Sequence, residues 1–143
     1  MPATSVRPRD FSRTSSSCTA RNANLEGIGL ASLNLGIARY RLGEHALPQA
    51  CFEDAETCFA EIGFPGHAAH ARQGLAGCAG AAGRFEDAAV LLGRAATELT
   101  ELGWSDDDFD ARLVSETEDA ARAALGDEAF EDAYAAGRLA GAT

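Results

Sequence analysis

Two stretches of equal length decide the fold of this chain: residues 35–63, LGIARYRLGEHALPQACFEDAETCFAEIG, and residues 75–103, LAGCAGAAGRFEDAAVLLGRAATELTELG. A single shift in numbering relates them, and it aligns Gly43 with Gly83, Ala55 with Ala95, and Glu61-Ile62-Gly63 with Glu101-Leu102-Gly103. In both stretches apolar residues recur every three or four positions, and glycine follows each run, as expected where helices end. Self-similarity at this period is typical of a helical solenoid, in which each helical hairpin buries its apolar face on the next.

The apolar pattern predicts two helical pairs over these stretches. The first helix begins near Asn22 and ends at Gly43, and the second ends at Gly63. The third and fourth helices are expected over about residues 67–82 and 85–102. No segment alternates apolar and polar residues over the length that a strand requires.

A third, degenerate pair is expected to follow. Ser105 with Asp108 has the spacing of a capping box, which marks the start of a helix. That helix is predicted to end at Gly126, and the last helix is predicted to end near Gly137. The sequence therefore predicts an all-α fold of about three helical pairs, close to the minimum that a stable repeat array needs.

The charge of the chain excludes several functions. Net charge is −10, from 22 acidic and 12 basic side chains, and all twelve basic residues are arginine. Nucleic-acid binding requires clustered basic side chains, so direct contact with DNA or RNA is not expected. Without lysine the chain lacks the phosphate-binding residue of a Walker-A loop and cannot form a Schiff base.

Residues 1–21, MPATSVRPRDFSRTSSSCTAR, have neither a helical nor a strand period. Their composition predicts a disordered tail, and residues 22–143 are expected to form the helical domain. A transit sequence is the alternative for this basic segment, which lacks the apolar core of a secretory signal. The most apolar interior stretch, residues 75–82, is too short to cross a bilayer. We therefore expect a cytoplasmic protein with free thiols, and no membrane contact.

Several positions of the two copies resemble the tetratricopeptide repeat. They are Leu35, Gly36, Arg39, Tyr40, Gly43, Phe52 and Ala55 in the first copy, and Leu75, Ala76, Gly83, Ala88, Leu92 and Ala95 in the second. The resemblance implies a short right-handed solenoid. Residues 91–103 and 121–139 further resemble the C-terminal part of actinobacterial LuxR-type and related signal-transduction ATPase regulators. Pro48 departs from the repeat pattern, and no P-loop is found, so the ATPase and DNA-binding activities of those regulators are not carried over.

In tetratricopeptide proteins the first helix of each pair lines a concave groove that holds a partner segment. Matched by position, the resemblance assigns ten residues to such a groove: Leu30, Leu33, Ile37, Tyr40, Arg41, His70, Gln73, Gly77, Gly80 and Ala81. Leu33 and Ile37 have an alternative role in the core. Gly74, Gly77 and Gly80 each cost a helix about 1 kcal/mol relative to alanine. Either close helix–helix approach or a shallow groove floor would offset that cost.

The cysteines and histidines form no recognised site. Zinc-ligand residue types do occur close together, but no C-x-x-C or H-E-x-x-H motif is present. The residues of zinc-ligand type are Cys51, Cys58, Cys78, His67 and His70. Buried thiols acting as small apolar residues are the favoured interpretation, and no metal or cofactor is expected. No motif supports a cysteine or serine nucleophile, so we predict that the chain is not an enzyme.

Two functional hypotheses follow. The first is a non-catalytic protein–protein interaction module, with a regulatory role, whose groove binds a protein or peptide segment; self-association through a second copy of the chain is one form of it. The alternative is a detached sensory or regulatory C-terminal arm of a LuxR-type ATPase transcriptional regulator. Residues 98–132 hold thirteen carboxylates and two arginines, which form either a solvated face or a docking surface for a basic partner.

Overall fold

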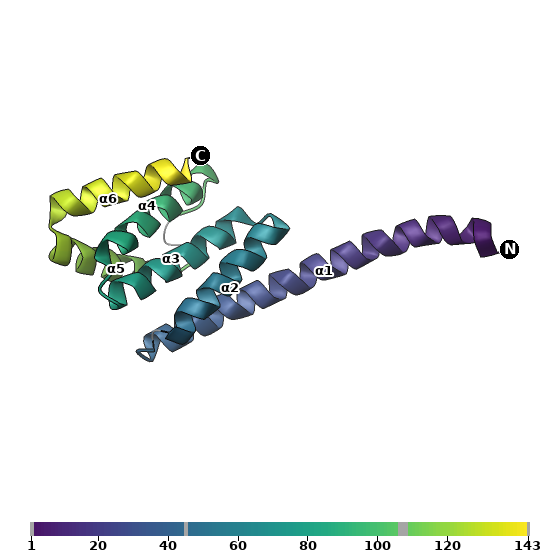
Figure 1. The fold of residues 1–143 in the computed structure, drawn as a ribbon, viewed down its shortest axis with the longest axis horizontal. Helices are drawn as coiled ribbons and strands as arrows, with labels where there is room; N and C mark the ends of the chain where they lie inside the picture. Colours follow the sequence, from purple (N-terminus) through teal and green to yellow (C-terminus); the bar gives the residue numbers. More distant parts are fainter. Residues whose placement is uncertain (1, 45, 106–108, 143) are drawn as a thin grey trace.

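The computed structural model describes residues 2–44, 46–105 and 109–142, with side chains from Arg21 onward. These residues form six helices, α1 (Pro2–Arg41), α2 (Ala46–Ile62), α3 (Pro65–Ala81), α4 (Phe85–Glu101), α5 (Ala111–Leu125) and α6 (Asp127–Gly141) (Figure 1). The described residues include no strand, which confirms the all-α class. Helix α1 begins at Pro2, whereas the sequence predicted a start near Asn22. The side chains of residues 1–20 are not described, and the disordered tail predicted for residues 1–21 stays a prediction. None of the described helices combines the length and the apolar composition that a membrane crossing requires.

The first four helices end in the same type of turn. Gly43, Gly63, Gly83 and Gly103 all have positive φ, between 75° and 84°. At the second turn the N–H of Gly63 donates to the carbonyl oxygen of Ala60 at 3.3 Å, and the N–H of Phe64 donates to that of Phe59 at 2.8 Å. This is the Schellman motif, in which a left-handed glycine closes the helix. The helix ends predicted at Gly43 and Gly63 are therefore confirmed.

Helix α3 lies at the centre of the molecule. Helices α1, α2, α3 and α4 pack one after another, α5 lies against α3 and α4, and α6 runs along α4 (Figure 1). Twelve of the 17 residues of α3 are buried, most of them alanine or glycine. Small side chains allow neighbouring helices to approach α3 from several directions. α3 begins at Pro65, two residues earlier than predicted, because proline suits the first turn of a helix.

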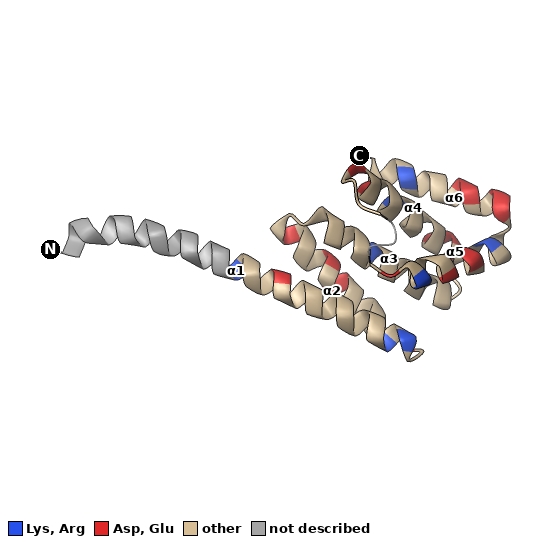
Figure 2. Ribbon diagram, turned by 180° about the vertical axis from the view of Figure 1, so that it is seen from behind, with Lys and Arg blue, Asp and Glu red and all other residues tan. Residues whose placement is uncertain are grey.

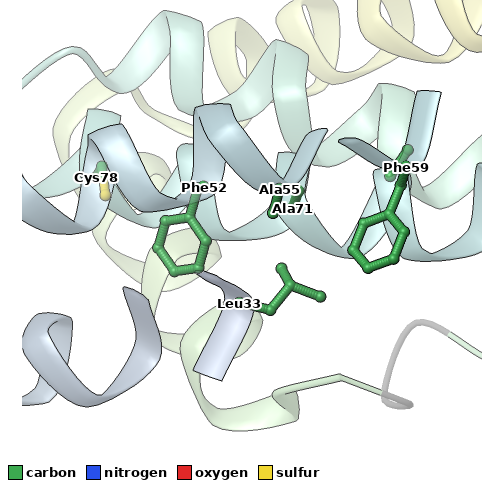
Figure 3. Packing of buried hydrophobic residues seen from close by; sticks show 7 residues of the cluster. Leu33, Phe52, Ala55, Phe59, Ala71 and Cys78 are labelled. Carbon is green, nitrogen blue, oxygen red and sulfur yellow. The ribbon is translucent and has the colours of Figure 1, made fainter. Parts of the chain in front are cut away.

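Glycines receive the aromatic rings of the main core. This core holds Leu33, Phe52, Ala55, Phe59, Ala71 and Cys78, all labelled in Figure 3, together with Ala68. A Cβ added at Gly74 would lie 2.5 Å from the ring of Phe52, and one at Gly36 would lie 2.8 Å from the same ring. Gly74 thus makes room for the Phe52 ring where α2 packs on α3, which favours close helix–helix approach over a groove floor.

The third helical pair departs from the prediction at two places. Helix α5 begins at Ala111, and its N-cap is Asp110, whose carboxylate accepts from the N–H of Leu113 at 3.0 Å. The predicted cap at Ser105 is therefore wrong; its partner Asp108 lies outside the described residues. Gly137 does not end α6, which continues to Gly141. Instead a Cβ on Gly137 would overlap the carbonyl oxygen of Val90, so this glycine brings α6 into contact with α4.

Candidate functional site

An aromatic pocket opens at the end of the molecule where α2 turns into α3 and α4 ends. It has a volume of about 310 Å³ and is lined by Gly63, Phe64, Pro65, Gly66, His67, Leu102 and Trp104. Three of these side chains are large, apolar and accessible: Phe64 and Trp104 are each 37% exposed, and Leu102 is 42% exposed. Exposed apolar side chains gathered around one pocket commonly mark a binding site.

The repeat places Phe64 and Trp104 in equivalent positions. Each is the first residue after a left-handed glycine, and each donates its N–H to a carbonyl in the last turn of the preceding helix, Phe64 to Phe59 at 2.8 Å and Trp104 to Leu99 at 2.9 Å. A hydrophobic contact commonly accompanies this motif, and the rings of Phe64 and Phe59 are stacked with centroids 6.4 Å apart. Because the two turns are separated by one full repeat, they lie at the same end of neighbouring helical pairs.

The wall between the two turns is built by the start of α3. A Cβ at Gly66 would lie 2.5 Å from the Trp104 ring, so only glycine lets the indole lie directly on the helix. The His67 ring contacts Trp104 with centroids 5.5 Å apart and Phe59 with centroids 5.0 Å apart. The indole of Trp104 therefore packs closely on the first turn of α3.

Behind the pocket the aromatic contacts continue into the interior. His70, which is 5% exposed, lies 5.4 Å from Trp104 and is stacked on Phe109 at 5.4 Å between ring centroids. Phe109 in turn meets Phe52 edge-on at 6.5 Å. A series of ring contacts thus leads from Trp104 to the main core.

The chemistry available in the pocket is that of apolar contact. Its lining consists of aromatic, aliphatic and glycine residues with His67 at the side. Among the described residues no group of three or more histidine, cysteine or acidic side chains is placed to hold a metal ion. The arrangement suits an apolar side chain of a ligand that stacks on Trp104 or Phe64.

The three described cysteines are poorly suited to nucleophilic attack. Cys51 and Cys78 are buried, Cys58 is half-buried, and none of the three is in a disulfide. Burial raises the pKa of Cys78 to about 11, and it raises the pKa of Cys51 and of Cys58, with Asp54 adding to the rise in both. A thiol with a raised pKa is protonated at neutral pH, whereas a reactive cysteine needs the thiolate.

The structure brings together only part of the groove expected from the resemblance. Tyr40, Gly77, Gly80 and Ala81 line a small pocket of about 130 Å³. Its remaining wall comes from α5, through Glu116, Thr117 and Ala120. Arg41 lies beside it and pairs with Asp110 at 2.9 Å and with Glu116 at 3.2 Å.

The other predicted groove residues are divided between core and surface. Leu33, His70 and Gln73 are buried, Ile37 packs against the core, and Leu30 is 38% exposed. Helix α5 covers this side of α3, because Leu113 packs on Gly77 and Thr117 contacts Gly80. Binding of a partner by the predicted groove residues stays a prediction.

No match to this chain is found among protein-family models, curated proteins or solved structures.

Sequence reasoning did not identify Phe64, Leu102 and Trp104 as site residues. A usable signal was nevertheless present: the shift that aligns Gly63 with Gly103 also aligns Phe64 with Trp104. What the sequence did not indicate is that Gly66 leaves room for the indole and that both rings face one pocket.

Proposed function

We propose that this chain is a non-catalytic protein–protein interaction module in which the aromatic pocket holds an apolar side chain of a partner protein. In this proposal the six helices form tetratricopeptide-like hairpins in a short right-handed solenoid. The internal sequence repeat and the four identical turns support the repeat arrangement. The exposure of Phe64, Leu102 and Trp104 around one pocket is the observation that carries the binding role.

The size and shape of the pocket favour a side chain over a whole small ligand. At about 310 Å³ it lies at the lower limit of ordinary ligand pockets. Aromatic anchors seated in a pocket are the usual centre of a protein–protein interface, because they bury much apolar area with little loss of side-chain entropy. We infer a helical or extended segment that inserts one large apolar residue.

A partner segment that binds the pocket also meets negative charge on this chain. Glu101, which precedes Leu102, is exposed, and the chain as a whole carries a net charge of −10. A partner segment with arginine or lysine beside its apolar anchor is therefore favoured, through faster association more than through affinity. High salt should slow its association while leaving the apolar contact intact.

A selection experiment with a built-in reporter tests this function. Trp104 is the only tryptophan of the chain, so its fluorescence reports on the pocket directly. Peptides selected on the parent protein from a displayed library are expected to contain a large apolar residue beside a basic one. They should shift the emission of Trp104 on binding, as burial of the indole changes its surroundings.

Two variants decide whether binding uses the pocket. Phe64→Ser removes one wall, and the matched variant Leu139→Ser removes an exposed leucine on α6, which is 73% exposed and does not line the pocket. Loss of binding in Phe64→Ser alone, at unchanged helix content, supports the proposal. Peptides that bind both variants and the parent equally would remove the pocket from consideration.

A further inference from the structure

Helix α1 has two apolar faces, and the molecule covers only one of them. Its inner face packs through Gly29, Leu33 and Gly36 against the rings of Phe59 and Phe52 on α2. Yet the whole segment of residues 22–38, NANLEGIGLASLNLGIA, contains a single charged residue, Glu26 (Figure 2). Its other polar side chains are Asn22, Asn24, Ser32 and Asn34, and a helix with so little charge is normally covered on more than one face. The outer face of α1 therefore lacks the cover that its composition predicts.

The outer face carries a regular stripe of apolar residues. We call it the α1 stripe; it consists of Ile28, Ala31, Leu35, Ala38 and Leu42, and all five residues are exposed. Ile28, Leu35 and Leu42 are 52%, 44% and 71% exposed. The spacing alternates between three and four residues, so large residues occupy the first position of each heptad and alanines the fourth. This is the pattern by which two helices pack in a coiled coil.

The charges beside the α1 stripe are neutralised within the chain. Arg39 pairs with Glu44 at 3.2 Å, and Arg41 pairs with Asp110 and Glu116. The residues between Ile28 and Leu35, among them Ser32 and Asn34, are uncharged. A partner recognised by opposite charge is therefore not indicated for this surface.

Elsewhere the chain repels copies of itself. Residues 44–143 hold 20 acidic side chains and six arginines, whereas residues 2–41 hold two acidic side chains and six arginines. Two copies can therefore approach along residues 22–38, which carry a single charge and an exposed apolar face, without bringing their acidic parts together.

We propose that the α1 stripe is a self-association surface, on which α1 of a second copy packs antiparallel as a short two-stranded coil. In an antiparallel coil the first heptad position of one helix faces the fourth position of the other. In this register Ile28 meets Ala38 of the partner copy and Leu35 meets Ala31, so large and small residues interlock at the centre, and Leu42 lies at the edge of the contact. A two-fold interface requires such self-complementarity, because the same patch supplies both sides.

The opposite orientation fits less well. A parallel pair would stack leucine on leucine and alanine on alanine, and these layers need different distances between the helix axes. It would also bring Arg39 and Arg41 of the two copies to the same end. The antiparallel pair separates these residues and aligns the helix dipoles favourably.

Sedimentation of the full chain under reducing conditions tests the association. The parent is expected to dimerise with increasing concentration, and salt should not weaken the dimer, because the contact is apolar. Leu35→Glu, which puts two charges at the centre of the interface, should weaken the dimer by more than about tenfold. The matched variant Leu139→Glu changes an exposed leucine on α6 and should dimerise like the parent.

Two outcomes overturn the proposal. One is a parent that stays monomeric up to about 100 µM, well above the range of a specific interface of ordinary strength; the stripe would then be left to a helix of another protein. The other is equal weakening in Leu35→Glu and Leu139→Glu. Neither outcome affects the aromatic pocket, because no stripe residue lines it.

Cross-linking determines the orientation. With Cys18 and Cys58 replaced by serine, Asn34→Cys should form a disulfide dimer, because the middle of the stripe lies on the two-fold axis of the antiparallel pair. Leu42→Cys should not, because antiparallel packing moves the two copies of residue 42 to opposite ends. Cross-linking of Leu42→Cys without Asn34→Cys would show a parallel pair and overturn the antiparallel arrangement.

Discussion

Four glycines of α1 and α3, in one half of the molecule, face aromatic rings, whereas the three glycines within α4 and α6, in the other half, face backbone. Gly36 and Gly74 enclose the ring of Phe52. In the other half, a Cβ on Gly93 would overlap the carbonyl oxygen of Tyr134, and one on Gly141 would lie 2.7 Å from that of Arg94. Glycine thus makes room for an aromatic ring in one half, and in the other half it allows two helix backbones to come into contact.

This difference predicts how each half tolerates change. A ring that is pushed by a new methyl group can tilt or be replaced by a smaller side chain, so the strain in the first half can be relieved locally. Backbone cannot be exchanged, so α4 and α6 must move apart as rigid bodies if a side chain is added between them. The four predictions below test this contrast, beginning with the largest effect.

Gly137→Ala should be the most damaging glycine substitution. The added Cβ would overlap the carbonyl oxygen of Val90, so α6 must separate from α4 along its length. We expect the free energy of unfolding to fall by about 3 kcal/mol, measured by urea denaturation. The control is Gly27→Ala, where nothing lies within 4 Å of the new Cβ. That change should stabilise the chain by about 0.5–1 kcal/mol through helix propensity; equal losses in both variants would contradict the packing role.

Arg72 joins the two halves and should rank next. Its guanidinium on α3 pairs with Glu56 of α2 and Glu98 of α4, both at 2.8 Å, and its side chain is 11% exposed. Arg72→Ala leaves Glu56 without its cation and Glu98 with Arg94 alone, at 3.5 Å. We expect a cost of about 2–3 kcal/mol, because both carboxylates remain partly in contact with solvent.

Arg72→Met separates the charge from the packing of the side chain. Methionine keeps most of the volume, so thermal unfolding of the two variants compares lost charge with lost contact area. If Arg72→Met is as stable as the parent, the ion pairs contribute specificity but little stability.

Gly74→Ala tests the ring-facing half. We expect a loss of about 1–2 kcal/mol, because the Phe52 ring must shift from its place between α1 and α3. Phe52→Leu should cost a similar amount alone by leaving a cavity. The double variant should be less destabilised than the sum of the two, since the smaller leucine leaves room for the new methyl group. Strict additivity in the double-mutant cycle would mean that the glycine does not serve the ring.

The smallest effect concerns the same core at alkaline pH. Burial raises the pKa of Cys78 from its ordinary value of 9.0 to about 11. Between these values the unfolded chain has lost the thiol proton and the folded chain has kept it, so stability is complete below pH 9 and falls as pH rises. The loss at pH 10 should be about 1 kcal/mol. Cys78→Ala should show a flatter decline from pH 8 to pH 10; an unchanged decline would assign the effect to other groups.

The candidate site shows where prediction from sequence stops. The resemblance assigned a groove to the first helix of each pair, but it contained no information on where α5 would lie. Asp110 caps α5 and pairs with Arg41 of α1, and Leu113 fits the space above Gly77. Long-range contacts of this kind depend on shape complementarity between distant segments, which apolar periodicity does not encode.

By itself the sequence determined the all-α class, the internal repeat and the helix ends at Gly43, Gly63 and Gly126, because helical periodicity and left-handed glycines are local properties of the chain. It did not determine that α6 continues past Gly137, since a helix-breaking residue is tolerated where another backbone needs its space. Only the tertiary structure decided that Phe64 and Trp104 share one pocket, and that one face of α1 is left uncovered. Both depend on which helices become neighbours, and that is settled by packing across the whole molecule.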